Sequence, residues 1–220
     1  MAKNVLTEDL SEPLNGVTSA RLDIQVGDGN LTIDRLTGGE PLLVGGTLEY
    51  AEKQGAPTQT IATLGGQVSF TLRSGRAPQG WLRLPWATCN GANEWQIHLN
   101  PAVASEITAH SGGGNVKLDL ADTTVTRIDA DTGGGNVEIV LPDTVASVMA
   151  KSGAGNVFVS LPSGVEARIH AKTGLGKVIV DPRFRPIDKN TFESSDYETA
   201  AEKVEITLSS GAGNVTVSTR

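Results

Sequence analysis

The sequence Ser-Gly-Gly-Gly-Asn-Val-Lys-Leu at residues 111–118 recurs along the chain. Close copies lie at residues 26–33, 132–139, 152–159, 173–180 and 210–217. From position 115, successive asparagine-equivalent positions are 21, 20 and 21 residues apart, and the last copy follows 37 residues after position 177. A motif at a nearly constant step of this length indicates a repeat architecture.

Weaker copies fill the interval between residues 33 and 111. They lie at residues 46–48, 66–68 and 94–97, at steps that fit the same period. We therefore expect about nine rungs, stacked in the order of the sequence.

Each copy alternates apolar and polar residues, as Val116, Leu118 and Leu120 alternate with Lys117 and Asp119. This period of two is typical of β-strands with one buried face. The stretch before each turn alternates too, and its inward positions would be Ile107/Ala109, Ile128/Ala130, Val148/Ala150 and Ile169/Ala171. The pattern predicts an all-β solenoid, with an aligned β-sandwich as the alternative and one helical turn at about residues 198–203.

The glycine-rich turns open strands rather than helices, which excludes a phosphate-binding loop. They also lack the carboxylates and the nine-residue period of calcium-binding repeats. We expect the glycines to provide positive φ at the corners. We expect Asn115, Asn136 and Asn156 to stack as an amide ladder that Lys177 interrupts, and the other turn asparagines, Asn30 and Asn214, to have the same structural role.

Composition excludes several functional classes. The formal net charge is −7, and no Lys/Arg-rich run is present, so we expect no nucleic-acid partner. The acidic balance also argues against direct binding to anionic lipid surfaces. Cys89 is the only cysteine, which excludes an internal disulfide and a zinc site built on several thiolates. No apolar stretch long enough to span a membrane and no signal-peptide pattern occurs in this chain.

Catalytic and metal sites have little support in the sequence. His110, Asp129 and Asp131 would lie near one another on an outward face and are the one candidate acid/base group, but the acids are scattered singly among bases. A solvated face that fixes the register is the simpler interpretation. We expect no catalytic residues, no metal and no cofactor.

The repeat is broken at about residues 72–92. This segment holds two tryptophans and several arginines in a chain that is otherwise poor in aromatic residues. Because tryptophan and arginine are enriched at binding hot spots, we take Arg76, Trp81, Arg83 and Trp86 as the candidate binding residues. The alternative is that this segment folds back as a cover on the solenoid.

A second break lies at about residues 182–203. We predict that it packs over Phe158 and Ile179, which face outward on adjacent rungs. The last rung ends at Arg220, and we expect an open strand edge there through which copies of the chain could associate. The predicted organisation is an N-terminal tail at residues 1–15 and one solenoid domain at residues 16–220.

Residues 95–101 (Trp-Gln-Ile-His-Leu-Asn-Pro), with the Gly-x-Gly-Asn-Val and Leu-Pro turns that follow, resemble the bacterial adhesin-type "toastrack" domains. They are also similar to the C-terminal domain of cell-wall-active antibiotic response proteins. The resemblance implies a right-handed single-stranded β-helix associated with the cell envelope, and it brings no catalytic residues. The absence of a membrane segment in this chain departs from the family pattern.

Three functions follow as hypotheses. The leading one is a non-catalytic, adhesin-like binding or scaffold module of the envelope, whose partner is an unknown protein or a cell-wall glycan. The first alternative is a regulatory domain that senses an envelope ligand or partner protein. The second is a carbohydrate-active β-helix enzyme.

Overall fold

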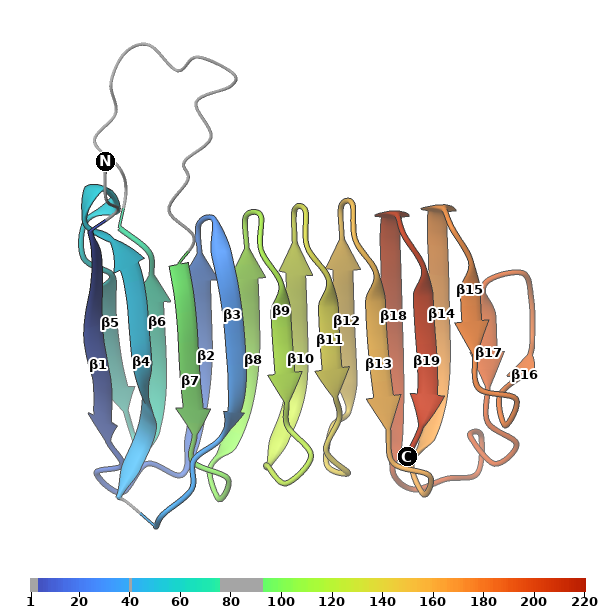
Figure 1. Ribbon diagram of the computed structural model, residues 1–220. Helices are drawn as coiled ribbons and strands as arrows, with labels where there is room; N and C mark the ends of the chain where they lie inside the picture. The colour runs from blue at the N-terminus through green and yellow to red at the C-terminus, as the bar shows by residue number, and fades with distance from the viewer. Residues whose placement is uncertain (1–3, 40, 76–92) are drawn as a thin grey trace.

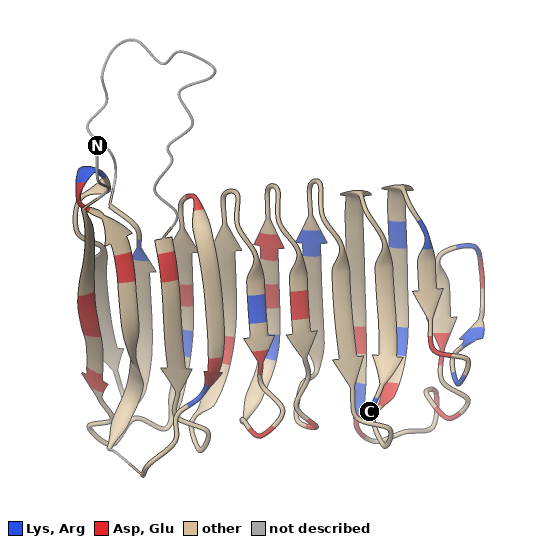
Figure 2. Ribbon diagram, in the orientation of Figure 1, with Lys and Arg blue, Asp and Glu red and all other residues tan. Residues whose placement is uncertain are grey.

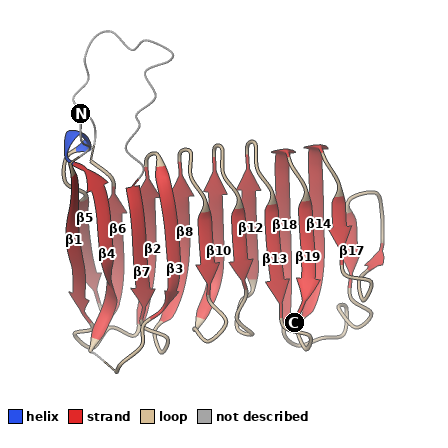
Figure 3. Cartoon of the chain, viewed as in Figure 1, coloured by secondary structure: helices blue, strands red, loops and turns tan. Residues whose placement is uncertain are grey.

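A computed structural model describes residues 4–39, 41–75 and 93–220 of the chain. Two large β-sheets face each other along the whole length of the molecule (Figure 1). The described residues contain one helix, a short 3-10 turn η1 at Glu52–Gln54, and residues 198–203 form no helix (Figure 3). The all-β class predicted from the period of two is therefore confirmed.

One sheet has nine strands. In spatial order they are β1 (Val5–Pro13), β4 (Leu42–Ala51), β7 (Asn93–Leu99), β3 (Gly29–Arg35), β9 (Val116–Asp119), β11 (Val137–Val140), β13 (Val157–Leu161), β19 (Val215–Thr219) and β15 (Val178–Val180).

The other sheet has ten strands. In spatial order they are β16 (Arg185–Pro186), β17 (Thr191–Glu193), β14 (Glu166–Leu175), β18 (Lys203–Ala212), β12 (Ser147–Ser152), β10 (Val125–Thr132), β8 (Ala104–Ser111), β2 (Ser19–Val26), β6 (Gln67–Arg73) and β5 (Thr58–Leu64).

Each copy of the repeat contributes one strand to each sheet, and we call such a pair a rung. The described chain has seven rungs, and within each sheet their strands run parallel. In space the rungs follow the order β6/β7, β2/β3, β8/β9, β10/β11, β12/β13, β18/β19 and β14/β15. Antiparallel strands extend the stack at both ends.

The rungs do not stack in the order of the sequence, contrary to our prediction. Rung β2/β3 lies between β6/β7 and β8/β9, and rung β18/β19 lies between β12/β13 and β14/β15. The predicted count of nine is also wrong, because residues 46–48 belong to the antiparallel strand β4 and residues 66–68 lie at the start of β6 in the ten-stranded sheet. Spacing alone cannot fix the neighbours, since either edge of a parallel strand can pair with any strand of matching pattern.

The first and last strands of the described chain are both part of the nine-stranded sheet. Residues 5–13, predicted as a tail, form β1 and pair antiparallel with β4. The C-terminal strand β19 is paired on both sides, with β13 and with β15. The expectation of an open C-terminal rung, and of association through it, is therefore wrong. The strands at the ends of the nine-stranded sheet are β1 and β15.

The core lies between the two sheets and is built from columns of apolar residues. The inward residues expected before each turn are all buried, namely Ile107, Ala109, Ile128, Ala130, Val148, Ala150, Ile169 and Ala171. Val116 and Leu118 face them from the opposite sheet and are also buried. Since each rung is only two short strands, its apolar side is covered by the facing sheet and by neighbouring rungs.

The segment at residues 182–203 does not cover Phe158 and Ile179. Strand β19 lies between these two residues, because Thr216 is in register with both. Phe158 is 39 % exposed and Ile179 51 % exposed. The segment instead adds β17 to the edge of β14 in the other sheet, and it buries Phe184 and Tyr197. The prediction that its aromatic residues are packing residues is confirmed for these two, but the predicted docking surface is wrong.

Candidate binding surface

The residues predicted to bind a ligand lie outside the described part of the chain. Arg76, Trp81, Arg83 and Trp86 all belong to residues 76–92, which connect β6 to β7. They remain a hypothesis that rests on the sequence. Arg73, which precedes this segment, is described and forms an ion pair with Asp23 on the neighbouring strand β2 at 3.4 Å.

The turn asparagines form a ladder along one edge of the stack. The side-chain oxygen of each accepts a hydrogen bond, of 2.8–2.9 Å, from the backbone N–H of the next position in space, in the order Asn30, Asn115, Asn136, Asn156, Asn214 and Lys177. The ladder is thus longer than predicted, and Lys177 ends it rather than interrupting it. The bonds run mainly from backbone to side chain; one amide-to-amide bond, from Asn156 to Asn136, measures 3.3 Å.

Most of the repeat glycines have a different role from the one we expected. Those in the turns at residues 112–114, 133–135 and 153–155 have no positive φ, whereas Gly29 and Gly176 have the predicted positive φ. A Cβ built on Gly135 would lie 2.1 Å from the carbonyl oxygen of Gly114 on the neighbouring rung, and one on Gly155 would lie 2.0 Å from that of Gly135. Glycine is therefore required by the close approach of stacked backbones.

A second ladder runs beside the asparagines, and the sequence analysis missed it. The hydroxyl that opens each turn donates a bond of 2.6–2.7 Å to a glycine carbonyl of an adjacent rung, at Ser111, Thr132, Ser152, Thr173 and Ser210. In the turn at residues 111–114, Ser111 also accepts from the backbone N–H of Gly114 at 3.0 Å. The signal was present, since five copies begin with serine or threonine.

The outward face of the ten-stranded sheet carries the predicted His110 and Asp131 pair. The two residues are in register on β8 and β10, and Nδ1 of His110 contacts the carboxylate of Asp131. Asp129 is in register with Thr108 instead. Both members of the pair are more than a third exposed to solvent. An exposed pair on a flat sheet lacks the water-excluding pocket that acid/base catalysis uses.

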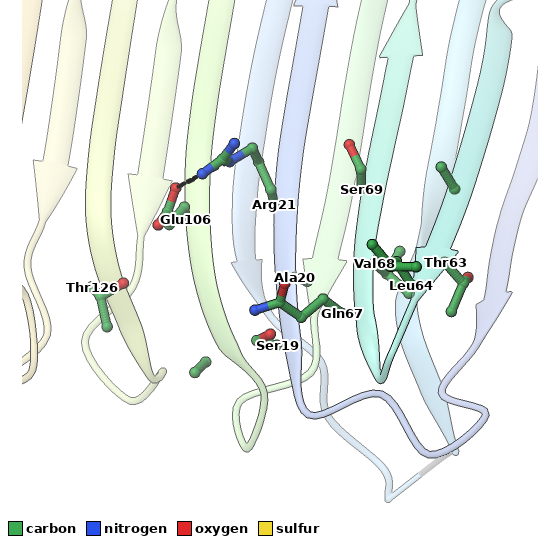
Figure 4. Close-up of a pocket in the computed structure, with 12 residues that line it drawn as sticks. Ser19, Ala20, Arg21, Thr63, Leu64, Gln67, Val68, Ser69, Glu106 and Thr126 are labelled. Atoms are coloured by element: carbon green, nitrogen blue, oxygen red, sulfur yellow. Dashed lines mark hydrogen bonds and ion pairs between the residues drawn. The ribbon is translucent and has the colours of Figure 1, made fainter.

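A shallow groove crosses the same face near the start of the strands (Figure 4). It has a volume of about 380 Å³ and is lined by residues of β5, β6, β2 and β8. Leu64 supplies apolar surface, and Gln67 supplies a polar side chain. Arg21 and Glu106 form an ion pair of 2.9 Å, drawn as a dashed line in Figure 4.

The groove continues into a second hollow of about 360 Å³ that shares Arg21 and Glu106. Arg127 and Asp129 add further charges there. Arg21, Glu106 and Arg127 are in register on three adjacent strands, so basic and acidic groups alternate along the row at the strand spacing of about 4.8 Å. A rigid row of donors and acceptors beside apolar surface is suited to hold an extended polar ligand.

A larger hollow of about 790 Å³ lies at the edge of the stack, between the turns at residues 143–146 and 162–165 and residues 201–203. It is lined by connecting segments, whereas the groove is lined mainly by strand residues. Strands position side chains more rigidly than loops do. We therefore take the groove as the candidate binding surface.

A separate charged cluster lies at the far edge of the ten-stranded sheet. Arg168 donates to Glu193 at 2.8 Å and to Glu198 at 2.6 Å, and its guanidinium lies over the ring of Tyr197. The hydrogen bond to Glu193 raises the pKa of Arg168. Burial raises the pKa of Tyr197. These contacts tie the segment at residues 182–203 to β14, so we assign the cluster a structural role.

Among residues 4–39, 41–75 and 93–220, no three His, Cys, Asp or Glu side chains are grouped as a metal site requires. In the same residues, no helix is long and apolar enough to cross a membrane.

A family model described as the N-terminal domain of toast_rack, DUF2154, matches residues 1–160. A comparison with curated proteins found no relative. Among solved structures, a candidate cell adhesion protein from Clostridium sporogenes is similar over 99 % of this chain and 100 % of its own, with 22 % sequence identity and a TM-score of 0.85. At that identity the likeness concerns the fold alone.

A candidate adhesin from Bacteroides fragilis also aligns, over 98 % of both chains. Its sequence identity is 12 % and its TM-score 0.34, too low to support an argument about this chain.

Proposed function

The chain belongs to the toast_rack N-terminal domain family, and from this premise we propose that it is a non-catalytic, adhesin-like binding or scaffold module associated with the cell envelope. The observation that carries the proposal is the groove on the outer face of the ten-stranded sheet, where basic and acidic side chains alternate on adjacent strands beside the exposed Leu64. Its partner is a cell-wall glycan or an envelope protein.

The groove fits such a partner for two reasons. Glycan hydroxyls and peptide amides both bond to alternating donors and acceptors, and the Arg21–Glu106 row supplies these. Leu64 is 83 % exposed beside them and offers apolar contact. Because the row lies on paired strands, little ordering entropy is lost when a ligand binds.

The test is co-sedimentation with purified peptidoglycan, comparing the wild type with an Arg21→Ala/Leu64→Ala variant. We expect the variant to lose most of the binding. Arg35→Ala is the matched control, because it also breaks an exposed ion pair, with Asp122 at 2.8 Å, outside the groove. Exposed ion pairs contribute only about 0–1 kcal/mol, so all three proteins should be folded.

Two results would count against the proposal. Equal retention of all three proteins would remove the groove from the binding surface, and release of soluble sugar from the peptidoglycan would contradict a non-catalytic role. If peptidoglycan retains none of the proteins, the same comparison with detergent-extracted envelope proteins decides between a protein partner and no partner.

We also propose that Arg76, Trp81, Arg83 and Trp86 contribute a second contact surface. Support comes from their composition, which is unusual for this chain. A Trp81→Ala/Trp86→Ala variant should bind the same envelope ligand more weakly at unchanged stability. Unchanged binding with lower stability would make the two tryptophans a cover for the solenoid.

For the scaffold we infer a right-handed single-stranded β-helix, interrupted at the two places where rung order departs from the sequence. Support comes from the parallel strands within each sheet and from the general rule that such crossovers are right-handed in about 98 % of cases. A crystal structure with left-handed connections between β8 and β13 would contradict it.

A further inference from the structure

The turn at residues 173–177 differs from the other turns at two positions. Leu175 occupies a place where the turns at residues 111–115, 132–136, 152–156 and 210–214 have glycine or alanine. Lys177 occupies the asparagine place. The Leu175 side chain is 75 % exposed, so it contributes little to the core. A single exposed leucine is common on protein surfaces, so its significance depends on the charges that surround it.

Three exposed lysines surround this tip. Lys151 and Lys172 are both in register with Ser209, so they lie two strand spacings apart, roughly 10 Å. Lys177 follows the tip on the other sheet. None of the three forms an ion pair with a described residue. Residues 147–160, 167–180 and 206–219 contain no Asp or Glu, and the acids of these strands, Glu166 and Glu205, lie toward the opposite ends of β14 and β18. The acid nearest in register is Asp131 on β10, which is opposite Lys151 and contacts His110.

The opposite end of the same edge is acidic. Asp28 occupies the tip of the turn between β2 and β3, and Glu49 and Glu94 are in register near the ends of β4 and β7. Figure 2 shows acidic segments at the upper ends of β4 and β7 and basic segments at the upper ends of β12, β14 and β15. The net charge of −7 is therefore unevenly distributed.

The distance between the acidic end and the three lysines determines whether the acidic groups affect binding at the lysines. In the nine-stranded sheet β4, β7 and β3 lie five to seven strand spacings from β15, roughly 24–34 Å at about 4.8 Å per strand. The Debye length at physiological salt is about 8 Å, so the acidic end is screened from whatever contacts the basic end. The argument from net charge against anionic surfaces does not hold for this corner.

We propose that Lys151, Lys172, Leu175 and Lys177, which we call the basic corner, dock the protein on an anionic lipid surface. Leu175 enters the headgroup region, while the lysines remain at the level of the phosphates. Because the lysines and Leu175 lie together at one corner, the stack is held with this corner toward the lipid. This proposal uses none of the groove residues, and either proposal can fail without the other.

A lipid surface fits the corner better than an acidic protein does. Specific protein interfaces bury about 1,200–2,000 Å² and centre on a cluster of apolar anchors. One leucine at the tip of a protruding turn, with lysines on both sheets around it, offers no such cluster. The same arrangement suits a headgroup layer, which closes around an inserted side chain. One leucine and three lysines give weak, reversible binding, enough to orient the module.

The test is co-sedimentation of the full chain with phosphatidylcholine vesicles, with and without phosphatidylglycerol. The variant Leu175→Ala/Lys177→Asn restores the sequence Gly-Ala-Gly-Asn found at residues 153–156 and 211–214, so its turn has two folded precedents in the same chain. Lys117→Asn is the control, because it removes the same charge from the outer face of β9.

We expect the wild type and Lys117→Asn to bind vesicles that contain phosphatidylglycerol and not to bind vesicles of phosphatidylcholine alone. The binding should weaken as the salt concentration rises. The double variant should bind at least about ten-fold more weakly, since each lysine near the surface contributes about five-fold and the leucine adds its apolar burial. The proposal would be overturned if the wild type did not bind phosphatidylglycerol vesicles, or if the double variant bound them as well as the wild type does. Loss of self-association in the double variant without any lipid binding would assign the corner to a protein contact instead.

Discussion

The middle of the stack and its end at β14/β15 are built from the same motif but differ in what surrounds it. In the middle, at β8 to β13, successive rungs are neighbours in space, and the turns keep glycine and asparagine. At the end, rung order departs from the sequence, the turn carries Leu175 and Lys177, and residues 182–203 add an edge of their own. The motif thus specifies the shape of a rung, whereas departures from it determine the neighbours and the contact surfaces.

The largest expected difference between the two regions concerns core packing. Val137 on β11 is fully buried, whereas Val178, the equivalent inward residue of β15, is only partly buried. Val137→Ala should lower the free energy of unfolding by about 2–3 kcal/mol, because it removes buried methyl groups and leaves a cavity. Val178→Ala should lower it by about 1 kcal/mol or less. Urea unfolding measures both, and equal losses would mean that the end is as tightly covered as the middle.

The turns give the next largest effect. Gly135→Ala should destabilise by about 1–3 kcal/mol, because its Cβ would meet the Gly114 carbonyl oxygen at 2.1 Å and the backbones would have to separate. Gly134→Ala is the matched control, since its Cβ would lie 3.6 Å from the Gly113 oxygen, and Leu175 occupies the equivalent place at the end. Similar unfolding midpoints for the two variants would refute close approach as the reason for glycine.

The asparagine ladder sharpens the comparison further. Asn136→Ala leaves the backbone N–H of Asn156 without its acceptor and should cost about 0.5–1.5 kcal/mol. Lys177→Ala should cost close to nothing, because Lys177 joins the ladder through its backbone N–H alone. Thermal unfolding of both variants measures the difference in stability loss. Equal melting temperatures for the two variants would mean that the ladder does not stabilise the fold.

The smallest expected effect is that the segment at residues 182–203 becomes less stably packed at low pH. Hydrogen bonds from the backbone N–H groups of Arg183 and Asn190 lower the pKa of Asp181 and Asp188 respectively. A carboxylate whose pKa is lower in the folded than in the unfolded state stabilises the fold at pH values above its ordinary pKa of about 3.9. This stabilisation is lost as the pH falls through the folded-state pKa. Proteolysis within residues 182–203 should therefore speed up below about pH 4 before the middle is cut. Asp188→Asn should show less of this pH dependence; an unchanged profile would exclude Asp188 as a cause.

The sequence predicted the local structure of a rung well. Alternation identified the inward residues of β8, β10, β12 and β14, and the repeat located the turns. The expected proximity of His110 and Asp131 is confirmed, because these residues lie on rungs that are adjacent in both sequence and space.

The rest could not be read from the spacing. Stacking in the order of the sequence would make Lys151 and Lys172 neighbours, but Ser209 lies between them, because the last copy in the sequence returns to an inner position. The alternating pattern of β19 and that of β15 are equally suited to pair with the edge of β13, so the sequence gives no basis for deciding which strand lies there. The groove escaped prediction for the same reason, since it needs β2 beside both β6 and β8.

Strand order at the end of the stack is tested most directly by disulfide cross-linking in a Cys89→Ser background. Phe158 and Thr216 are in register on adjacent strands, so a Phe158→Cys/Thr216→Cys variant should oxidise to an internal disulfide. Phe158→Cys/Ile179→Cys should not, because two strand spacings, about 10 Å, exceed the reach of the bond. A disulfide in the second variant and none in the first would contradict the insertion of β19 and restore stacking in sequence order.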